Sequence, residues 1–155
     1  MIRVAASLLL LTLSCSHAAQ RELALSLVPV ESAIRAGTAP HFRLTITNVS
    51  DHIMQVLDAE RRVDLQHTYY ALVISKDGKP VDLPRAISDP GPISATDWVE
   101  IPPGQSKVFL LANFPEKFET LPAGVYEAYV NFWRDPLQSH STAYRSPRVE
   151  FTVTK

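Results

Sequence analysis

The sequence predicts an all-β fold, an antiparallel β-sandwich of about eight or nine strands that follows an N-terminal signal peptide. Two observations predict the strands. Apolar residues alternate with polar ones, and no stretch after residue 19 keeps helical spacing for more than about one turn. Glycine and proline, which favour turns, stand between the alternating runs, with few exceptions.

Each expected strand is an alternating run of this kind. The first two runs place leucine, phenylalanine and isoleucine on one face and small or polar residues on the other, as antiparallel sheets with one wet face do. Pro29 lies inside the first run and predicts an edge strand or a bulge, because proline cannot donate to a neighbouring strand. The expected strands are residues 23–30, 41–47, 53–57, 68–75, 81–83, 97–101, 106–111, 125–133 and 148–154.

Turn residues predict how some of these strands connect. Asp77-Gly78 stands between two runs and favours a hairpin with a type I′ turn, because both central positions of that turn need positive φ. Pro102-Pro103-Gly104-Gln105 predicts a tight turn into the strand that follows it.

Residues 1–19 have the composition of a secretory signal peptide. Arg3 precedes an apolar run from Val4 to Leu13, small residues follow, and no acidic residue is present. The run holds about ten residues, far fewer than the ~20 needed to cross a bilayer, so we expect it to be removed after export. Residues 20–155 are then expected to form one domain in the periplasm or the secreted fraction.

Cys15 allows a second interpretation of the N-terminus. Residues 11–15 resemble a poor bacterial lipobox, in which the cysteine is lipidated and becomes the first residue of the mature chain, although Thr12 stands where such boxes usually carry leucine. A membrane partner is expected only in that case. If cleavage follows Ala19 instead, the mature chain contains no cysteine, and its core must be stable without disulfides.

The segment Leu121-Pro122-Ala123-Gly124-Val125-Tyr126 enters the longest expected strand. A tyrosine two residues after a glycine at such an entry resembles the tyrosine corner of immunoglobulin-like sandwiches, whose hydroxyl bonds to upstream backbone. Four segments carry a wider resemblance: 42–51, 76–79, 101–106 and 121–126. Together they are similar to exported bacterial immunoglobulin-like modules, and in order and spacing they are similar to the intracellular proteinase inhibitor family. The resemblance covers about residues 40–133 and implies the fold; its matched positions are turns and core, so no inhibitory residue is carried over.

Two long expected loops, 58–67 and 134–147, are where binding residues are sought, because loops on a rigid sheet scaffold commonly carry function. The candidate residues are Arg61, Arg62, Asp64 and His67 in the first loop and Arg134, Asp135, His140 and Tyr144 in the second.

Aromatic residues offer another binding surface. Tyr129 and Trp133 share the strand face opposite Tyr126 and would suit sugar or peptide contact if exposed, although that face would equally serve to pack a loop. Asn48-Val49-Ser50 is a formal glycosylation sequon, which matters only in a eukaryotic host.

Tests for chemistry predict no catalytic residues, no metal site and no cofactor. His52 and Met54, two residues apart on an expected strand, would share one face as two possible soft ligands. Copper carriers of this size generally use several methionines or a cysteine, so these two residues do not make a copper site. Asp135, His140 and Ser141 are close in sequence, but no motif frames them as a catalytic triad.

The sequence therefore favours a non-enzymatic, exported binding module, with a proteinase inhibitor and a small exported enzyme as alternatives. Residues 20–155 carry a formal charge of −2, since Arg3 is the one charged residue removed, so no electrostatic recruitment of nucleic acid is expected. The expected partner is another protein or a surface glycan, bound through the two loops or by strand addition at a sheet edge.

Overall fold

The computed structural model describes residues 22–83, 91–112, 117–135 and 143–155. This part of the chain is mostly strand, and its sheets are largely antiparallel, which confirms the all-β prediction. The expected signal peptide with Cys15, and His140 of the second loop, lie outside the described residues.

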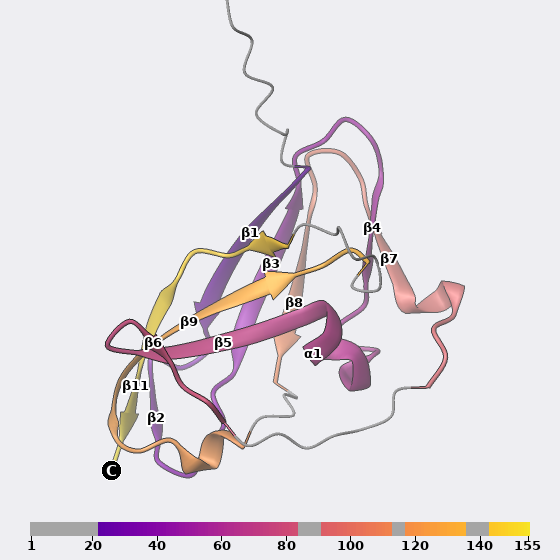
Figure 1. Ribbon diagram of the computed structural model, residues 1–155. Coiled ribbons are helices and arrows are strands. Elements are labelled where there is room, and N and C mark those ends of the chain that lie inside the picture. Colours follow the sequence, from indigo (N-terminus) through magenta and orange to yellow (C-terminus); the bar gives the residue numbers. More distant parts are fainter. Residues whose placement is uncertain (1–21, 84–90, 113–116, 136–142) are drawn as a thin grey trace, which may run out of the picture.

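One sheet has three antiparallel strands in the order β1-β3-β8 (Figure 1). Its strands are β1 (Leu23–Pro29), β3 (Phe42–Asn48) and β8 (Ser106–Leu111). Pro29 ends β1 at the edge of this sheet, as expected for a residue that cannot donate to a further strand.

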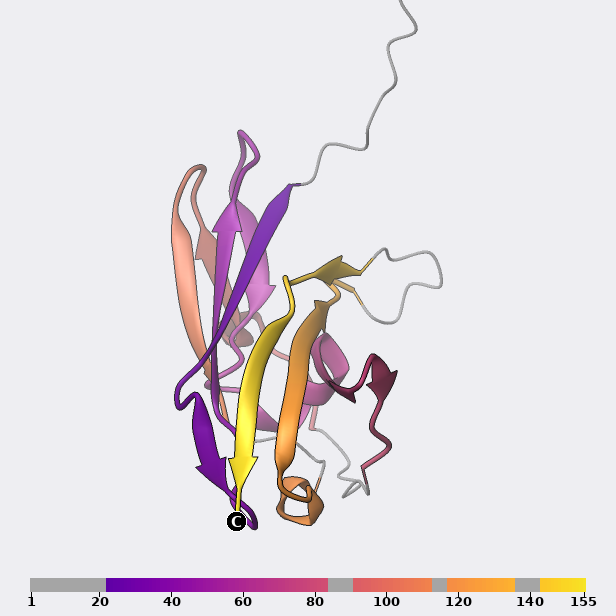
Figure 2. The ribbon, with the colours of Figure 1, turned by 90° about the vertical axis from the view of Figure 1, so that its left-hand side faces the viewer.

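The larger sheet has the order β2-β11-β9-β5-β6, and a short strand, β10, also pairs with β9. Its strands are β2 (Ala33–Arg35), β5 (Tyr70–Lys76), β6 (Lys79–Pro80), β9 (Gly124–Phe132), β10 (Tyr144–Arg145) and β11 (Val149–Thr154). The pairing of β2 with β11 is parallel, and the others are antiparallel. Figure 2 separates this sheet, with its yellow and orange strands, from β1, β3 and β8.

The remaining elements are short. A separate antiparallel pair joins β4 (Met54–Leu57) and β7 (Trp98–Ile101). The short helix α1 (Gln66–Tyr69) leads into β5. Single 3₁₀ turns are formed by η1 (Val63–Leu65), η2 (Ala95–Asp97) and η3 (Phe118–Thr120).

The predicted hairpin joins β5 to β6. Lys76 pairs with Lys79, and both residues between them have positive φ, 51° at Asp77 and 74° at Gly78. These are the signs that a type I′ turn requires, and Asp-Gly is one of the pairs that adopt them at low cost.

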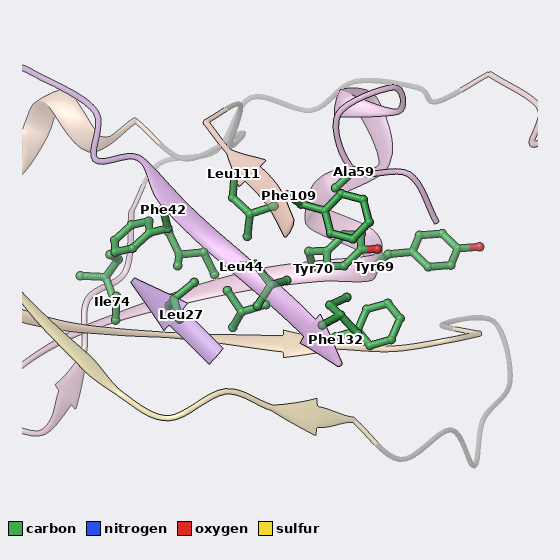
Figure 3. Packing of buried hydrophobic residues seen from close by; sticks show 14 of the residues in the cluster. Leu27, Phe42, Leu44, Ala59, Tyr69, Tyr70, Ile74, Phe109, Leu111 and Phe132 are labelled. Carbon is green, nitrogen blue, oxygen red and sulfur yellow. The ribbon is translucent and has the colours of Figure 1, made fainter. Parts of the chain in front are cut away.

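The hydrophobic core lies between the two larger sheets, and Figure 3 shows part of it. Phe42 of β3 meets Phe151 of β11 edge-on, with ring centroids 5.7 Å apart. Tyr70 of β5 contacts Phe109 of β8 at 5.9 Å and stacks on Phe132 of β9 at 4.9 Å. Alternation in the sequence therefore placed the apolar side chains of each sheet on the face toward the other sheet.

Three details of the predicted strands are wrong. The strand expected at residues 81–83 lies earlier, as β6 (Lys79–Pro80), and Leu83 packs into the core instead. Two short strands were missed, β2 and β10, which brings the strands of the described residues to eleven. Both pair with longer neighbours, so their backbone conformation is fixed by partners distant in sequence.

Candidate functional site

The first predicted binding loop is held down by Arg62. Its guanidinium donates to Asp97 at 2.8 Å and to both carboxylate oxygens of Asp64 at 2.8 and 2.9 Å. It also donates to the backbone carbonyls of Gly91 and Pro92, each at 3.0 Å. The Arg62 side chain is 11% exposed, so it joins two segments of the chain and is not displayed to a partner.

The electrostatics of this network agree with its geometry. The pKa of Asp97 lies below its usual value, chiefly because the carboxylate accepts a hydrogen bond from the Ser94 backbone, with a further contribution from Arg62. Hydrogen bonding to Arg62 likewise lowers the pKa of Asp64. Both acids are therefore ionised partners of a fixed cation.

Acid is expected to loosen this network. Because the folded-state pKa of Asp97 lies below the unfolded value of about 3.9, its ionised form stabilises the fold above about pH 4, and this stability is lost as pH falls through the folded pKa. Asp97→Asn is expected to melt at a lower temperature than the wild type at pH 7. Its melting temperature is expected to fall less than that of the wild type when the pH is lowered from 7 to below 4. Thermal melts across this range, with the exposed Asp82→Asn as control, check this; parallel curves for all three proteins contradict it.

The other two candidates of the first loop lie differently. Arg61 is exposed, and its Nε lies 3.6 Å from Asp97. His67 is half-buried in α1. The structure thus brings Arg61, Arg62 and Asp64 together around Asp97, a residue that the sequence did not single out.

Two candidate residues of the second predicted loop lie at one carboxylate, that of Glu22. Arg134 Nη1 donates to Glu22 Oε2 at 2.9 Å, and the Tyr144 hydroxyl lies 3.4 Å from the same oxygen. His52 Nε2 is 3.7 Å from the other carboxylate oxygen of Glu22. We call Glu22, His52, Arg134 and Tyr144 the end cluster.

Three members of the end cluster are placed by different parts of the fold. Glu22 precedes β1, and its carbonyl accepts a hydrogen bond from Val49. Arg134 follows β9, and Tyr144 lies in β10, opposite Phe132 in register. Burial raises the pKa of Tyr144, and the charge of Glu22 adds to this shift, so its hydroxyl stays a donor at neutral pH.

No feature of the sequence pointed to Glu22, and His52 stood out only as a possible metal ligand with Met54 and not as a neighbour of Glu22. Neither belongs to a motif, and they lie far in sequence from Arg134. Of the remaining candidates, Asp135 is next to Arg134, and its charge contributes to a raised pKa of Tyr69, a smaller cause than the burial of that ring.

Two weaker ideas from the sequence can be placed in the structure. His52 and Met54 are not joint ligands, because Met54 is buried in β4 whereas the His52 side chain is 54% exposed. Among the described residues, no three His, Cys, Asp or Glu side chains gather closely enough to hold a metal ion. Tyr129 and Trp133 are both half-buried.

Comparison with known proteins finds no matching family model and no matching curated protein. Among solved structures, a β-glucosidase from Listeria innocua in complex with glucose is similar at a TM-score of 0.44 and 14% identity over 86% of this chain. A β-glucosidase from Erythrobacter marinus is similar at a TM-score of 0.43 and 14% identity over 85% of this chain. The chain spans only 16% and 15% of the lengths of these two enzymes. No helix within the described ranges is long and apolar enough to cross a membrane.

Proposed function

We propose that this chain is an exported, non-enzymatic binding module with an immunoglobulin-like β-sandwich fold, and that it recognises another protein through its end cluster. The fold assignment is supported by the two packed sheets and by the Tyr126 hydroxyl, which donates to the carbonyl of Pro122 at 2.7 Å, the bond expected of a tyrosine corner.

The observation that carries the proposal is the convergence of Arg134 and Tyr144 on Glu22. Because Arg134 and Tyr144 both contact Glu22, the residue just before β1, the end of the domain presents these polar groups in a defined arrangement. Binding there costs less conformational entropy than binding to a surface whose side chains must first be ordered.

The end cluster also remains accessible. The side chains of Arg134, Glu22 and His52 are 44%, 36% and 54% exposed. Val49 and Ile53 beside it are exposed aliphatic residues. Aliphatic contacts flanked by charged groups are typical of protein interfaces, in which a partner's charged groups replace or extend the existing ion pairs.

Capture from an envelope extract tests the proposal. The immobilised mature chain is compared with Arg134→Gln, and with Arg61→Gln as a matched control, since Arg61 is an exposed arginine of the first loop. We expect Arg134→Gln to reduce the recovery of one protein, identified by mass spectrometry, and Arg61→Gln to leave it unchanged. Equal recovery by all three proteins would remove the end cluster from the function.

The alternatives predict different results. A proteinase inhibitor would block a member of a panel of serine and metallo-proteinases at micromolar concentration. An exported enzyme would require a carboxylate and a histidine placed around a substrate pocket, with activity lost on replacing either. The mass of the mature N-terminus tests export: Gln20 as first residue fits a secreted domain, lipidated Cys15 an anchored one, and a retained Met1 contradicts the proposal.

A further inference from the structure

A one-residue bulge separates β10 from β11. Arg145 pairs with Asn131 and Val149 pairs with Ala128. The three residues between Arg145 and Val149 therefore lie opposite only two residues of β9. Pro147, which has no N–H, lies within the bulge. Ser146 closes it on β9: its N–H donates to the Val130 carbonyl, and its hydroxyl accepts from the Val130 N–H, both at 3.0 Å.

The bulge decides where two arginines point. In a regular strand Arg145 and Arg148, three residues apart, would lie on opposite faces of the sheet. The additional residue places both on the outer face, where their guanidinium carbons lie 4.9 and 5.5 Å from the centre of the Tyr129 ring. Bulges commonly redirect side chains in this way next to functional sites.

Cross-strand bonds fix both guanidinium groups over the ring. Arg145 Nε donates to Asn131 Oδ1 at 3.0 Å, and Arg148 Nη1 donates to Glu127 Oε2 at 2.8 Å. We call Tyr129, Arg145 and Arg148 the outer-face site. Among the described residues, Arg145 uses only its Nε for hydrogen bonding and has a neutral partner, whereas Arg148 is paired with an acid.

We propose that the outer-face site binds a carboxylate group of an acidic peptide segment. The guanidinium of Arg145 lies over the Tyr129 ring and is bonded to Asn131 through Nε alone, so its terminal N–H groups remain for a ligand. These groups lie in the plane of the guanidinium, the geometry that binds a carboxylate in a bidentate way. The contact with Tyr129 and the bond to Asn131 restrict Arg145 in advance, so less side-chain entropy is lost when the ligand binds.

A glycan is less well matched to this surface. Sugars use the open face of an aromatic ring, and guanidinium groups cover Tyr129. Glu127 and Glu150 pair across the neighbouring strands and offset the charge of the two arginines. Recognition therefore depends on the N–H groups of Arg145 and not on a positive field over the whole face.

Titration of the mature chain with a short alternating Glu-Ala peptide tests the proposal, with the same peptide carrying Gln in place of Glu as the neutral probe. We expect the acidic peptide to bind, the neutral one not to bind, and Arg145→Gln to weaken binding by about tenfold or more, as loss of a charge-assisted hydrogen bond does. Arg43→Gln is the matched control, since Arg43 is an exposed arginine on the other sheet. Circular dichroism confirms that both variants fold.

Several results would overturn the proposal. One is the absence of binding at millimolar peptide, and another is equal weakening by Arg43→Gln. Tighter binding of a uronic-acid oligosaccharide or of inorganic phosphate than of the peptide would also overturn it. The outer-face site is separate from the end cluster, so Arg134→Gln is expected to leave peptide binding unchanged. A failure of the peptide to bind would therefore leave the proposed role of the end cluster, which the capture experiment tests, unaffected.

Discussion

Phe132→Ala is expected to lower the free energy of unfolding by about 3–5 kcal/mol, the range for removing a buried phenylalanine from a core. Phe132 has no exposed surface; it stacks on Tyr70 and also contacts Tyr144, at a centroid distance of 6.1 Å. Figure 3 shows its ring beside Tyr70, with the strands of both sheets around it. Truncation would leave a cavity that neighbours held in strands cannot fill.

Denaturant unfolding measures this loss, and Phe132→Leu serves as the control because it keeps most of the apolar volume. We expect the leucine variant to lie between the wild type and the alanine variant. Because domains are typically stable by about 5–15 kcal/mol, the alanine variant is expected to stay at least partly folded in the cold. Equal midpoints for wild type and Phe132→Ala would mean that the two sheets do not pack through this ring.

Asn48→Ala is expected to cause the second large loss of stability. Asn48 is fully buried, and its amide nitrogen donates to the carbonyls of His52 and Ile101, each at 2.7 Å. Its side-chain oxygen accepts from the backbone N–H and the hydroxyl of Ser50 at 2.9 and 2.6 Å. Each buried group left without a partner costs about 1–3 kcal/mol.

Asn48→Asp separates hydrogen bonding from packing. Aspartate keeps the shape of asparagine but cannot donate when ionised, so we expect at least the loss seen with alanine at pH 7. Val49→Ala, at an exposed position of the same turn, is the control and is expected to change little. Thermal melts of the three variants check this; a fully stable Asn48→Asp would exclude the donor role. The same geometry argues against the sequon as a modification site in the folded chain, because Asn48 has no exposed amide hydrogen.

The prediction of the all-β class came from features that act locally. Alternation fixes which side chains share a face, and a buried face requires strands of that period, so the long strands β1, β3, β8 and β9 were predicted to within a residue or two. The Asp77-Gly78 turn was predictable for the same reason, since the φ preferences belong to the two residues themselves.

The candidate site was predicted only in part. Arg134 and Tyr144 were named as loop residues, but Glu22, which joins them, gave no signal in the sequence. Arg62 was predicted to be displayed, and it is instead enclosed by Asp64 and Asp97. A charged residue in a polar stretch looks the same in either case, because its partner is chosen by chain segments that meet only in the folded state.

By itself, the sequence determined the strand class, the faces of the long strands and the hairpin turn, since these depend on side-chain period and on backbone preferences of single residues. The tertiary structure decided that β2 pairs with β11 and β10 with β9. It also decided the network around Arg62 and the bulge that brings Arg145 and Arg148 over Tyr129. The physical reason is that each of these contacts joins segments that meet only in the folded chain, where a shift of one residue between strands would reverse every side chain.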